Sequence, residues 1–201
     1  MKNNKKMTGI IAGLLLLIVV LVAAVIALFA VRGKKESTEA IDAAGKHHIE
    51  IQVKDYGTIM AELDGDAAPI TVANFLKLAE SGFYDGLTFH RIIDGFMIQG
   101  GDPKGNGTGG ADKTIKGEFS QNGVENKLSH VRGTLSMARS QDMDSASSQF
   151  FIAQSDCTYL DGQYAAFGTV TEGMELVDKI FKDTPVQDNN GTVSAADQPV
   201  I

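Results

Sequence analysis

Short stretches of alternating apolar and polar residues make up most of the chain after residue 46. In residues 47–53, every second position is apolar (Ile49, Ile51, Val53), and residues 58–63 alternate in the same way. A period of two places successive side chains on opposite faces of a strand. The pattern therefore predicts short strands, over residues 47–53, 58–63, 87–93, 96–99, 133–139, 149–154, 165–170 and 198–201.

Two segments have helical spacing instead. Val72 and Phe75 lie on one apolar face of a segment that begins at Pro69 and ends before Gly82. A second amphipathic segment covers residues 174–181. Many short strands with two short helices indicate a mainly β fold, a closed antiparallel barrel. The helices are expected to plug its ends, and the filled interior places a ligand site on the outer face.

The longest apolar run of the chain is Ile10–Val31, 22 residues without a charge. At about 1.5 Å per residue, a helix of this length crosses a hydrocarbon core of about 30 Å. We therefore expect residues 1–9 to be a basic tail, 10–31 a transmembrane anchor, 32–46 a linker and 47–201 the folded domain. A cleaved signal peptide and a buried core helix are the alternatives.

Charges on the two sides of this run are nearly balanced, with three lysines before it and Arg32, Lys34 and Lys35 after it. The very short leading tail favours a cytoplasmic N-terminus. The expected location is the cell membrane, as a single-pass protein with an extracytoplasmic domain.

The net charge of −7 is unevenly distributed. Residues 1–35 hold six of the 18 basic residues and none of the 25 acidic ones, so the remainder carries −13. Such an acidic domain is repelled by nucleic acid, which we exclude as a partner. Cys157 is the only cysteine, so no internal disulfide can form.

No metal site is expected. His47 and His48 are neighbours in a predicted strand, so their side chains point to opposite faces. Asp142 and Asp144 lie two residues apart in a polar loop that lacks the rest of an oxygen-ligand set for calcium.

Residues 89–110 combine the chemistry that a binding site needs. Asp94-Gly95 separates two short apolar runs, which is a strong hairpin signal. One arm carries Arg91, and the other carries Phe96, Met97 and Gln99. Six glycines occur in the eleven positions 100–110, so the backbone there can approach a ligand closely. A cation, an apolar patch and an amide suit an uncharged peptide. No parallel β-α-β context surrounds these glycines, which argues against a dinucleotide site.

This stretch resembles the central signature of the cyclophilins, the peptidyl-prolyl cis/trans isomerases. The resemblance runs from about Gly57 to Ile180 and includes residues 133–138, 147–152, 160–162 and 167–168. It implies an eight-stranded barrel capped by two helices, a monomer without a cofactor, and a role in protein folding on proline-containing peptides and folding proteins.

The chemistry of this reaction is demanding but needs no nucleophile. Rotation about an X–Pro bond crosses a barrier of roughly 18–20 kcal/mol and takes tens to hundreds of seconds uncatalysed. The twisted state returns a lone pair to the prolyl nitrogen. A fixed donor near that nitrogen stabilises the transition state more than the planar amide. Arg91 is the natural donor because its guanidinium is rigid and always charged.

The resemblance assigns further roles. It implies that Gln99 holds the substrate carbonyl and orients Arg91, the two forming the catalytic pair. Gly107 lines the adjoining subsite. The residues implied to form the proline pocket and to contact the peptide are Phe96, Met97, Ala138, Arg139, Ser140, Gln149, Phe151, Tyr159, Leu160 and Tyr164.

Several positions depart from the eukaryotic pattern of the family. Tyr159 stands where that pattern has tryptophan, Tyr164 where it has histidine, and Arg139 where asparagine is frequent. Without the indole N–H, only weak cyclosporin binding is expected. The altered Arg139 position affects the expected substrate preference. Catalysis is not put in doubt, because Arg91 is present.

A rival interpretation is a proline-peptide-binding chaperone module with incidental isomerase activity. The presence of Arg91, Gln99 and Phe151 together favours an enzyme, because a pure binder does not need the guanidinium. A proline-isomerisation assay separates the two.

Overall fold

The computed structural model describes residues 42–201, which belong to one compact unit. The predicted tail, the predicted anchor and most of the predicted linker lie outside the described residues. Within residues 42–201, neither helix is long and apolar enough to cross a membrane.

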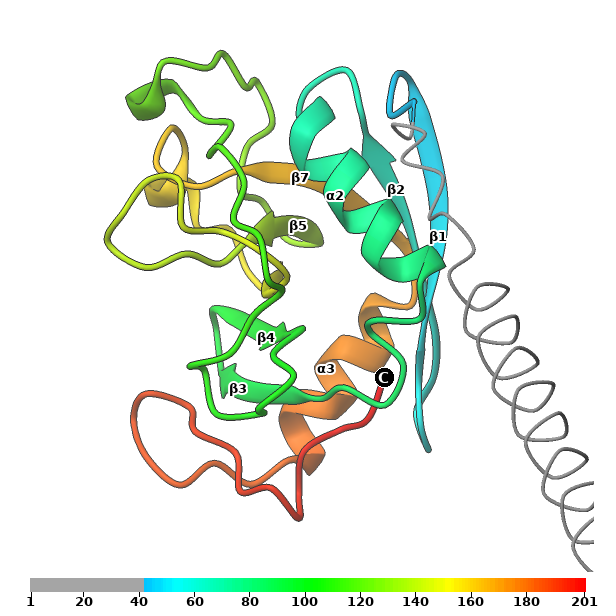
Figure 1. Ribbon diagram of the computed structural model, residues 1–201. Helices are drawn as coiled ribbons and strands as arrows, with labels where there is room; N and C mark the ends of the chain where they lie inside the picture. Colours follow the sequence, from blue (N-terminus) through cyan, green and yellow to red (C-terminus); the bar gives the residue numbers. More distant parts are fainter. Residues whose placement is uncertain (1–41) are drawn as a thin grey trace, which may run out of the picture. The chain divides into compact units, whose positions relative to one another are not determined.

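Seven antiparallel strands form one curled sheet (Figure 1) in the order β1-β2-β7-β5-β6-β4-β3. Each strand follows one of the alternating stretches of the sequence. The strands are β1 Lys46–Val53, β2 Gly57–Asp64, β3 Phe89–Ile93, β4 Met97–Gly100, β5 Thr134–Met137, β6 Phe150–Ala153 and β7 Ala166–Glu172. The mainly β fold and the first seven predicted strands are confirmed.

The predicted hairpin at Asp94-Gly95 is also present. β3 and β4 pair with Arg91 opposite Gln99 and Ile93 opposite Met97. Gly95 has φ +72°, a conformation that glycine adopts without strain. The hairpin therefore places the arginine and the amide side by side, as the sequence predicted.

An eighth strand and a closed barrel are not confirmed. Residues 198–201 form only one isolated bridge, between Val200 and Thr88 at the start of β3. The N–H of Lys54, just after β1, donates to the Val200 carbonyl at 2.8 Å. Pro199 has no N–H to donate to a ladder. The segment consequently spans the gap between the edge strands β1 and β3 without becoming a strand of its own (Figure 1).

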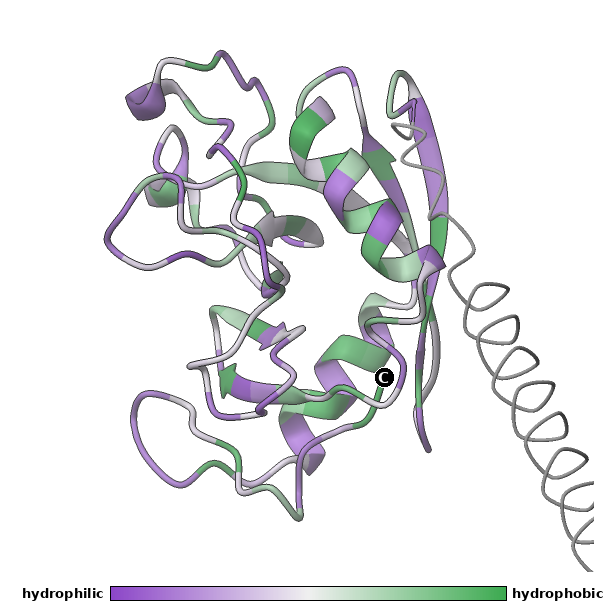
Figure 2. Cartoon of the chain, in the orientation of Figure 1, coloured by the Kyte–Doolittle hydropathy of each residue, from purple (hydrophilic) through white to green (hydrophobic). Residues whose placement is uncertain are grey.

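Two α-helices pack against the sheet, and both contact β2. They are α2 Pro69–Glu80 and α3 Met174–Asp183, accompanied by the short 3₁₀ turns η1 Ser120–Asn122 and η2 Thr158–Leu160. Figure 2 shows apolar residues on the helix faces that look toward the sheet. Val177 and Ile180 of α3 are fully buried there.

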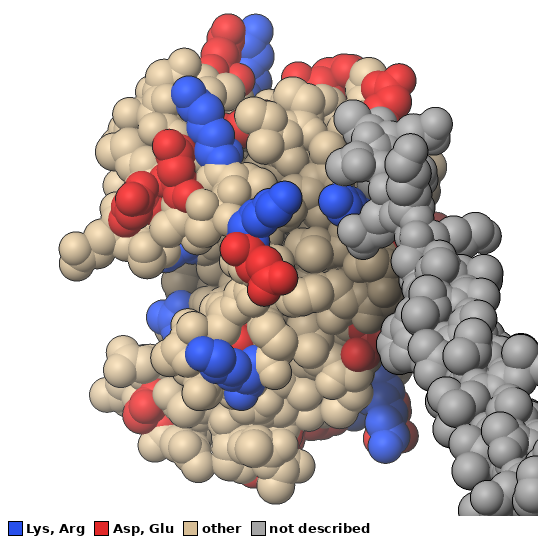
Figure 3. Space-filling view, in the orientation of Figure 1, with Lys and Arg blue, Asp and Glu red and all other residues tan. Residues whose placement is uncertain are grey.

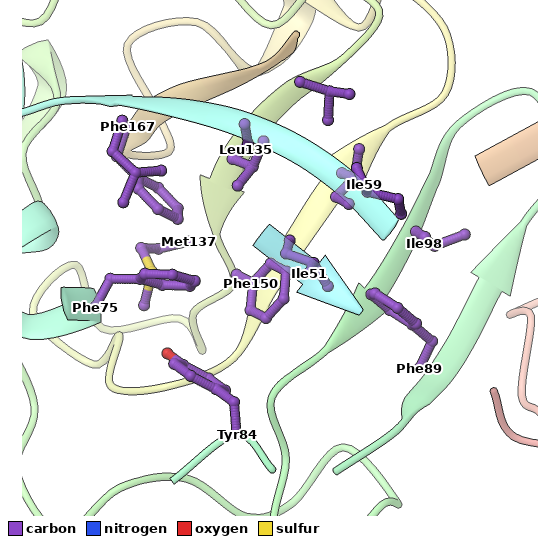
Figure 4. Packing of buried hydrophobic residues seen from close by; sticks show 14 of the residues in the cluster. Ile51, Ile59, Phe75, Tyr84, Phe89, Ile98, Leu135, Met137, Phe150 and Phe167 are labelled. Carbon is purple, nitrogen blue, oxygen red and sulfur yellow. The ribbon is translucent and has the colours of Figure 1, made fainter. Parts of the chain in front are cut away.

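Aromatic rings fill much of the core (Figure 4). The ring of Phe75 from α2 lies 5.4 Å from that of Phe150 in β6 and 5.2 Å from that of Phe167 in β7. Tyr84 stacks on Phe75 at 4.9 Å. One sheet face is therefore occupied by core packing, and a ligand must use the other.

Charged side chains of both signs are interspersed on the face of the described domain that Figure 3 shows. Exposed ion pairs of the described domain include Lys46 with Asp64 and Arg132 with Asp178. This face carries no extended basic surface.

Candidate active site

A row of side chains crosses the outer face of the sheet. Arg91 of β3 pairs with Gln99 of β4, Gln99 pairs with Phe151 of β6, and Phe151 pairs with Ser136 of β5. The adjacent residues in these strands point into the core, namely Ile92, Ile98, Ile152 and Leu135. Since neighbours in a strand alternate, the row lies opposite the core. Pairing has thus brought together three predicted site residues from three strands.

Hydrogen bonds fix the two residues predicted to be catalytic. Arg91 donates from Nη1 to Gln99 Oε1 at 3.0 Å and from Nε to the Asn190 carbonyl at 2.9 Å. Gln99 donates from Nε2 to Gln149 Oε1 at 2.8 Å. Gln149 in turn donates to the carbonyl of Gly109 at 2.7 Å. This chain orients the Gln99 amide so that its oxygen faces the guanidinium.

The Arg91 guanidinium is only half-buried. Burial lowers the pKa of Arg91, and the charges of Tyr164 and Asp188 oppose that shift. An arginine remains protonated throughout the physiological range. Of its five N–H groups, two have the acceptors given above, and the other three have none within residues 42–201. The side chain is therefore held at two points while retaining donors for a ligand.

Apolar and aromatic side chains border this row. The ring of Phe96 lies 6.3 Å from that of Phe151 and 6.1 Å from that of Tyr159. Tyr164 meets Phe151 edge-on at 6.4 Å. Tyr159 is 64% exposed at the rim, whereas Phe151 is 4% exposed at the floor. The rings form a shallow aromatic basin beside the guanidinium.

Met97 and Leu160 complete the predicted apolar set. Met97 lies two residues before Gln99 in β4, hence on the same sheet face, and is 1% exposed. Leu160 is half-buried at the end of η2, next to Tyr159.

A separate cavity of about 290 Å³ adjoins Gln99. The predicted site residues Gly107, Ala138, Arg139, Ser140 and Gln149 all line this cavity. The first and the last of them are more than 40 residues apart in the sequence. Its remaining lining residues are small and polar: Thr108, Gly109, Ser145 and Ser147. The predicted site residues therefore divide into an aromatic basin and a polar cavity, with Gln99 between them.

Arg139 supports neighbouring residues in addition to lining the cavity as predicted. Its Nε and Nη2 donate to the Gln163 carbonyl at 3.1 and 2.9 Å. Its guanidinium lies over the Tyr164 ring, 4.6 Å from the centroid. Arg139 therefore supports a wall of the basin as well as lining the cavity.

A buried histidine beneath the basin was not predicted from the sequence. The ring of His130 stacks near that of Phe151 at 6.1 Å, and its Nδ1 lies 2.7 Å from Asp161 Oδ1. Its Nε2 lies 2.9 Å from Ser136 Oγ. Burial lowers the pKa of His130, although Asp161 opposes the shift, so the ring is neutral near pH 7. The Nδ1–H then donates to Asp161, and Nε2 accepts from Ser136.

This histidine joins the segment that carries Tyr159 and Leu160 to the sheet. The His130 backbone N–H also donates to Asp161 Oδ1, at 2.7 Å. In the sequence, His130 and Asp161 are 31 residues apart, each in a polar loop. No periodic pattern links the two residues, so the sequence alone does not predict their contact. Ser136 is completely buried, so the arrangement is a support and not a nucleophilic centre.

No group of three or more His, Cys, Asp or Glu side chains within residues 42–201 is placed to hold a metal ion. The site described above combines a fixed cation, amides and an aromatic surface, which suits a neutral peptide.

Comparison with known proteins identifies a family with this fold. The model of the family described as "Cyclophilin type peptidyl-prolyl cis-trans isomerase/CLD" matches residues 48–199. Peptidyl-prolyl cis-trans isomerase B of Bacillus subtilis is 50% identical over 124 residues, which cover 62% of this chain and 83% of that protein. A probable peptidyl-prolyl cis-trans isomerase of Brucella suis is 41% identical over 178 residues, covering 83% and 85%.

A solved structure has the same fold. The cyclophilin-type peptidyl-prolyl cis-trans isomerase of Cryptosporidium parvum, crystallised in the presence of the dipeptide Ala-Pro, matches with a TM-score of 0.68. The two sequences are 33% identical, and the match covers 77% of this chain and 95% of that one.

Proposed function

This chain belongs to the cyclophilin-type family and is a peptidyl-prolyl cis-trans isomerase, and we propose that Arg91 supplies its catalytic step. The observation that carries the proposal is the guanidinium held by Gln99 and the Asn190 carbonyl beside the aromatic basin. Three N–H groups without an acceptor in residues 42–201 remain for a substrate.

The mechanism is stabilisation of the twisted amide. As the C–N bond rotates, the prolyl nitrogen becomes pyramidal and gains a lone pair. An Arg91 N–H donates to that lone pair, which the planar ground state does not offer. The substrate carbonyl is held through the Gln99 amide. No covalent bond forms or breaks, and no proton is transferred.

The two parts of the site bind different parts of the peptide. The proline ring occupies the basin formed by Phe96, Met97, Phe151 and Leu160. Tyr159 and Tyr164 form the rim of this basin. The peptide backbone before proline follows Ala138–Ser140, and an earlier side chain enters the polar cavity with Gln149 and Gly107. The Ala-Pro dipeptide named with the similar Cryptosporidium structure supports this class of ligand. Cyclosporin binds the same surface weakly, because tyrosine replaces tryptophan at position 159.

The Arg91→Ala variant tests the mechanism. We expect kcat/KM for an X–Pro peptide to fall roughly 10²–10³-fold, as for the loss of one preorganised donor. Peptide affinity should change much less, since the aromatic basin remains. Arg91→Lys should recover only part of the activity, because an ammonium lacks the rigid fork. The measurements are turnover in a protease-coupled assay and peptide affinity by titration.

Arg132→Ala provides a matched control, since Arg132 forms an exposed ion pair with Asp178 outside the site. It should keep wild-type turnover. Near-wild-type turnover in Arg91→Ala would refute the mechanism. If the wild-type protein bound the X–Pro peptide with the same affinity as Arg91→Ala but had negligible turnover, the chaperone module would be favoured instead.

We further propose that residues 10–31 anchor the protein in the cell membrane with an extracytoplasmic domain that acts as a monomer on folding proteins. The uncharged 22-residue run supports this proposal. The full chain should remain with sedimented membranes after a high-salt wash, whereas mature protein free in the medium and starting near residue 31 would show a cleaved signal.

A further inference from the structure

A turn near the C-terminus contacts the back of Arg91. We call residues 188–192 the Asp188 turn. This segment has no periodic pattern in the sequence and lies about 100 residues after Arg91. It nevertheless pairs with the free edge of β3, the strand that carries the arginine.

Backbone hydrogen bonds fix the turn against β3. The N–H of Ile92 donates to the Gly191 carbonyl at 2.8 Å, and the N–H of Val193 donates to the His90 carbonyl at 3.1 Å. Arg91 and Thr192 form an antiparallel bridge between these two bonds. The turn is therefore in register with Arg91 itself.

Gly191 makes this close approach possible. Its φ is +77°, and a Cβ at this position would overlap the carbonyl oxygen of Ile92. A larger residue would therefore be strained and would separate the turn from β3.

The Asp188 carboxylate holds the turn in shape. Its Oδ1 accepts from the N–H of Asn190 at 2.9 Å and from that of Thr192 at 3.1 Å. Its Oδ2 accepts from Thr192 Oγ1 at 2.9 Å. These bonds orient the peptide unit of Asn190 so that its carbonyl accepts from Arg91 Nε at 2.9 Å.

We propose that the Asp188 turn is a positioning element for isomerisation, with Asp188 and Gly191 as positioning residues that act through Arg91. The Asn190 carbonyl and Gln99 Oε1 grip the guanidinium at Nε and Nη1, which fixes both its plane and its rotation. Gln99 alone leaves the plane free to turn about one hydrogen bond. The inference rests on the proposed function, because it assigns the turn to the catalytic role of Arg91.

The test compares Asp188→Ala with the same change in an Arg91→Ala background, using the full chain. Asp188→Ala should lower kcat by about 10-fold to 10²-fold, the range that misplacement of a catalytic group produces. Peptide affinity should change less than about twofold, because the basin is untouched. In the Arg91→Ala background the added change should have no further effect on kcat, since the turn acts through the missing guanidinium.

Two further variants separate positioning from folding. Asp188→Asn retains an acceptor oxygen for the N–H groups of Asn190 and Thr192 and should recover most of the activity. Asp197→Ala, a matched control, removes an exposed aspartate that accepts from Ser194 Oγ and should leave kcat unchanged. If Asp188→Ala does not fold, Thr192→Val takes its place in the same cycle, because it removes only the hydroxyl bond to Asp188.

The outcomes distinguish this inference from the proposed function. Wild-type kcat in Asp188→Ala, together with low kcat in Arg91→Ala, would overturn only the inference. Equal losses from Asp188→Ala in both backgrounds would show a general structural role and would also overturn it. Undiminished kcat in Arg91→Ala itself would refute the proposed catalytic role of Arg91, on which this inference rests.

Discussion

At the scale of single residues, Gln99 organises the site through the two ends of its amide. Its oxygen accepts from Arg91, and its nitrogen donates to Gln149. The same side chain lines the polar cavity, so it connects the Arg91 guanidinium to that cavity. The sequence predicted the Arg91–Gln99 pair because both lie on one hairpin, eight residues apart.

Arg91's other partner was not predictable in this way. The Asn190 carbonyl comes from a segment with no periodic pattern, and a backbone group carries no sequence signal. Ser136 lies in a predicted strand, but its partner His130 comes from a loop without a periodic pattern, so their hydrogen bond was not predictable either. Residue identities reveal the groups that react, whereas the groups that hold them emerge only from the folded chain.

Tyr159 allows a test of the resemblance at one position. It is 64% exposed at the rim of the basin, where a tryptophan would present an indole N–H to a ligand. Tyr159→Trp should tighten cyclosporin binding about threefold to tenfold, as expected for one added hydrogen bond of roughly 0.5–1.5 kcal/mol. Isothermal titration measures the change. Tyr56→Trp, on the turn after β1, should not alter the affinity, and an unchanged affinity in Tyr159→Trp would place the drug elsewhere.

At the scale of elements, alternation identified the strands because each has one face in the core and one outside. Residues 112–132 are mostly polar and show no such alternation in the sequence. In the structure, this region supplies both His130 under the basin and Glu118 at the start of α2. Each acts on an element far away in sequence, so no local pattern predicts its role.

Glu118 takes the place of a helix cap. The residue before α2, Ala68, has no side chain that can cap the helix. Glu118 is 1% exposed and accepts from the N–H of Ile70 at 3.0 Å and from the N–H and hydroxyl of Thr71, both at 2.7 Å. A carboxylate at a helix N-terminus also interacts favourably with the helix dipole. One buried side chain therefore connects α2 to the loop before η1.

We expect Glu118→Gln to destabilise the domain. The neutral amide loses the charge-assisted bonds, each worth about 1.5–3 kcal/mol, and turns an N–H₂ group toward existing donors. The free energy of unfolding of residues 36–201, measured in urea, should fall by about that amount. Glu125→Gln is the control, because Glu125 pairs with Lys127 on the surface and such pairs contribute only about 0–1 kcal/mol. Equal stability of the two variants would show that Glu118 is not the cap.

At the scale of the whole domain, features that arise within one short stretch of sequence could be predicted, whereas contacts between distant stretches could not. The curled sheet and its filled interior follow from patterns within each strand. Residues 198–201 form one isolated bridge and a few backbone hydrogen bonds with the segments beside β1 and β3, and a short alternating stretch cannot reveal how many ladder bonds it will form. The site likewise needs segments from positions 91 to 190, and only its hairpin is local in sequence.

Two buried histidines make the stability of the domain depend on pH. His90 and His130 are 4% and 0% exposed. Burial lowers the pKa of both below the ordinary value of 6.5, although Asp102 and Asp161, respectively, oppose the shift. Neither nitrogen of the His90 ring makes a hydrogen bond of normal geometry within residues 42–201, so the Asp102 charge only partly offsets the desolvation of a protonated ring.

The unfolded chain therefore binds more protons than the folded one between the lowered pKa values and 6.5. In that window the free energy of unfolding decreases as the pH falls, with a limiting slope of about 1.4 kcal/mol per pH unit for each histidine. Carboxylates with lowered pKa values, such as Asp102 and Asp161, lose their contribution only near and below pH 3.8, so they do not obscure the window.

Urea unfolding of residues 36–201 between pH 7.5 and 5 measures this slope, and His90→Phe should reduce it because one of the two titrating rings is removed. A urea midpoint that stays constant over this range would mean that neither histidine resists protonation in the folded state. A slope that His90→Phe leaves unchanged would assign the whole effect to His130, whose protonation breaks its bond from Ser136 directly beneath the aromatic basin.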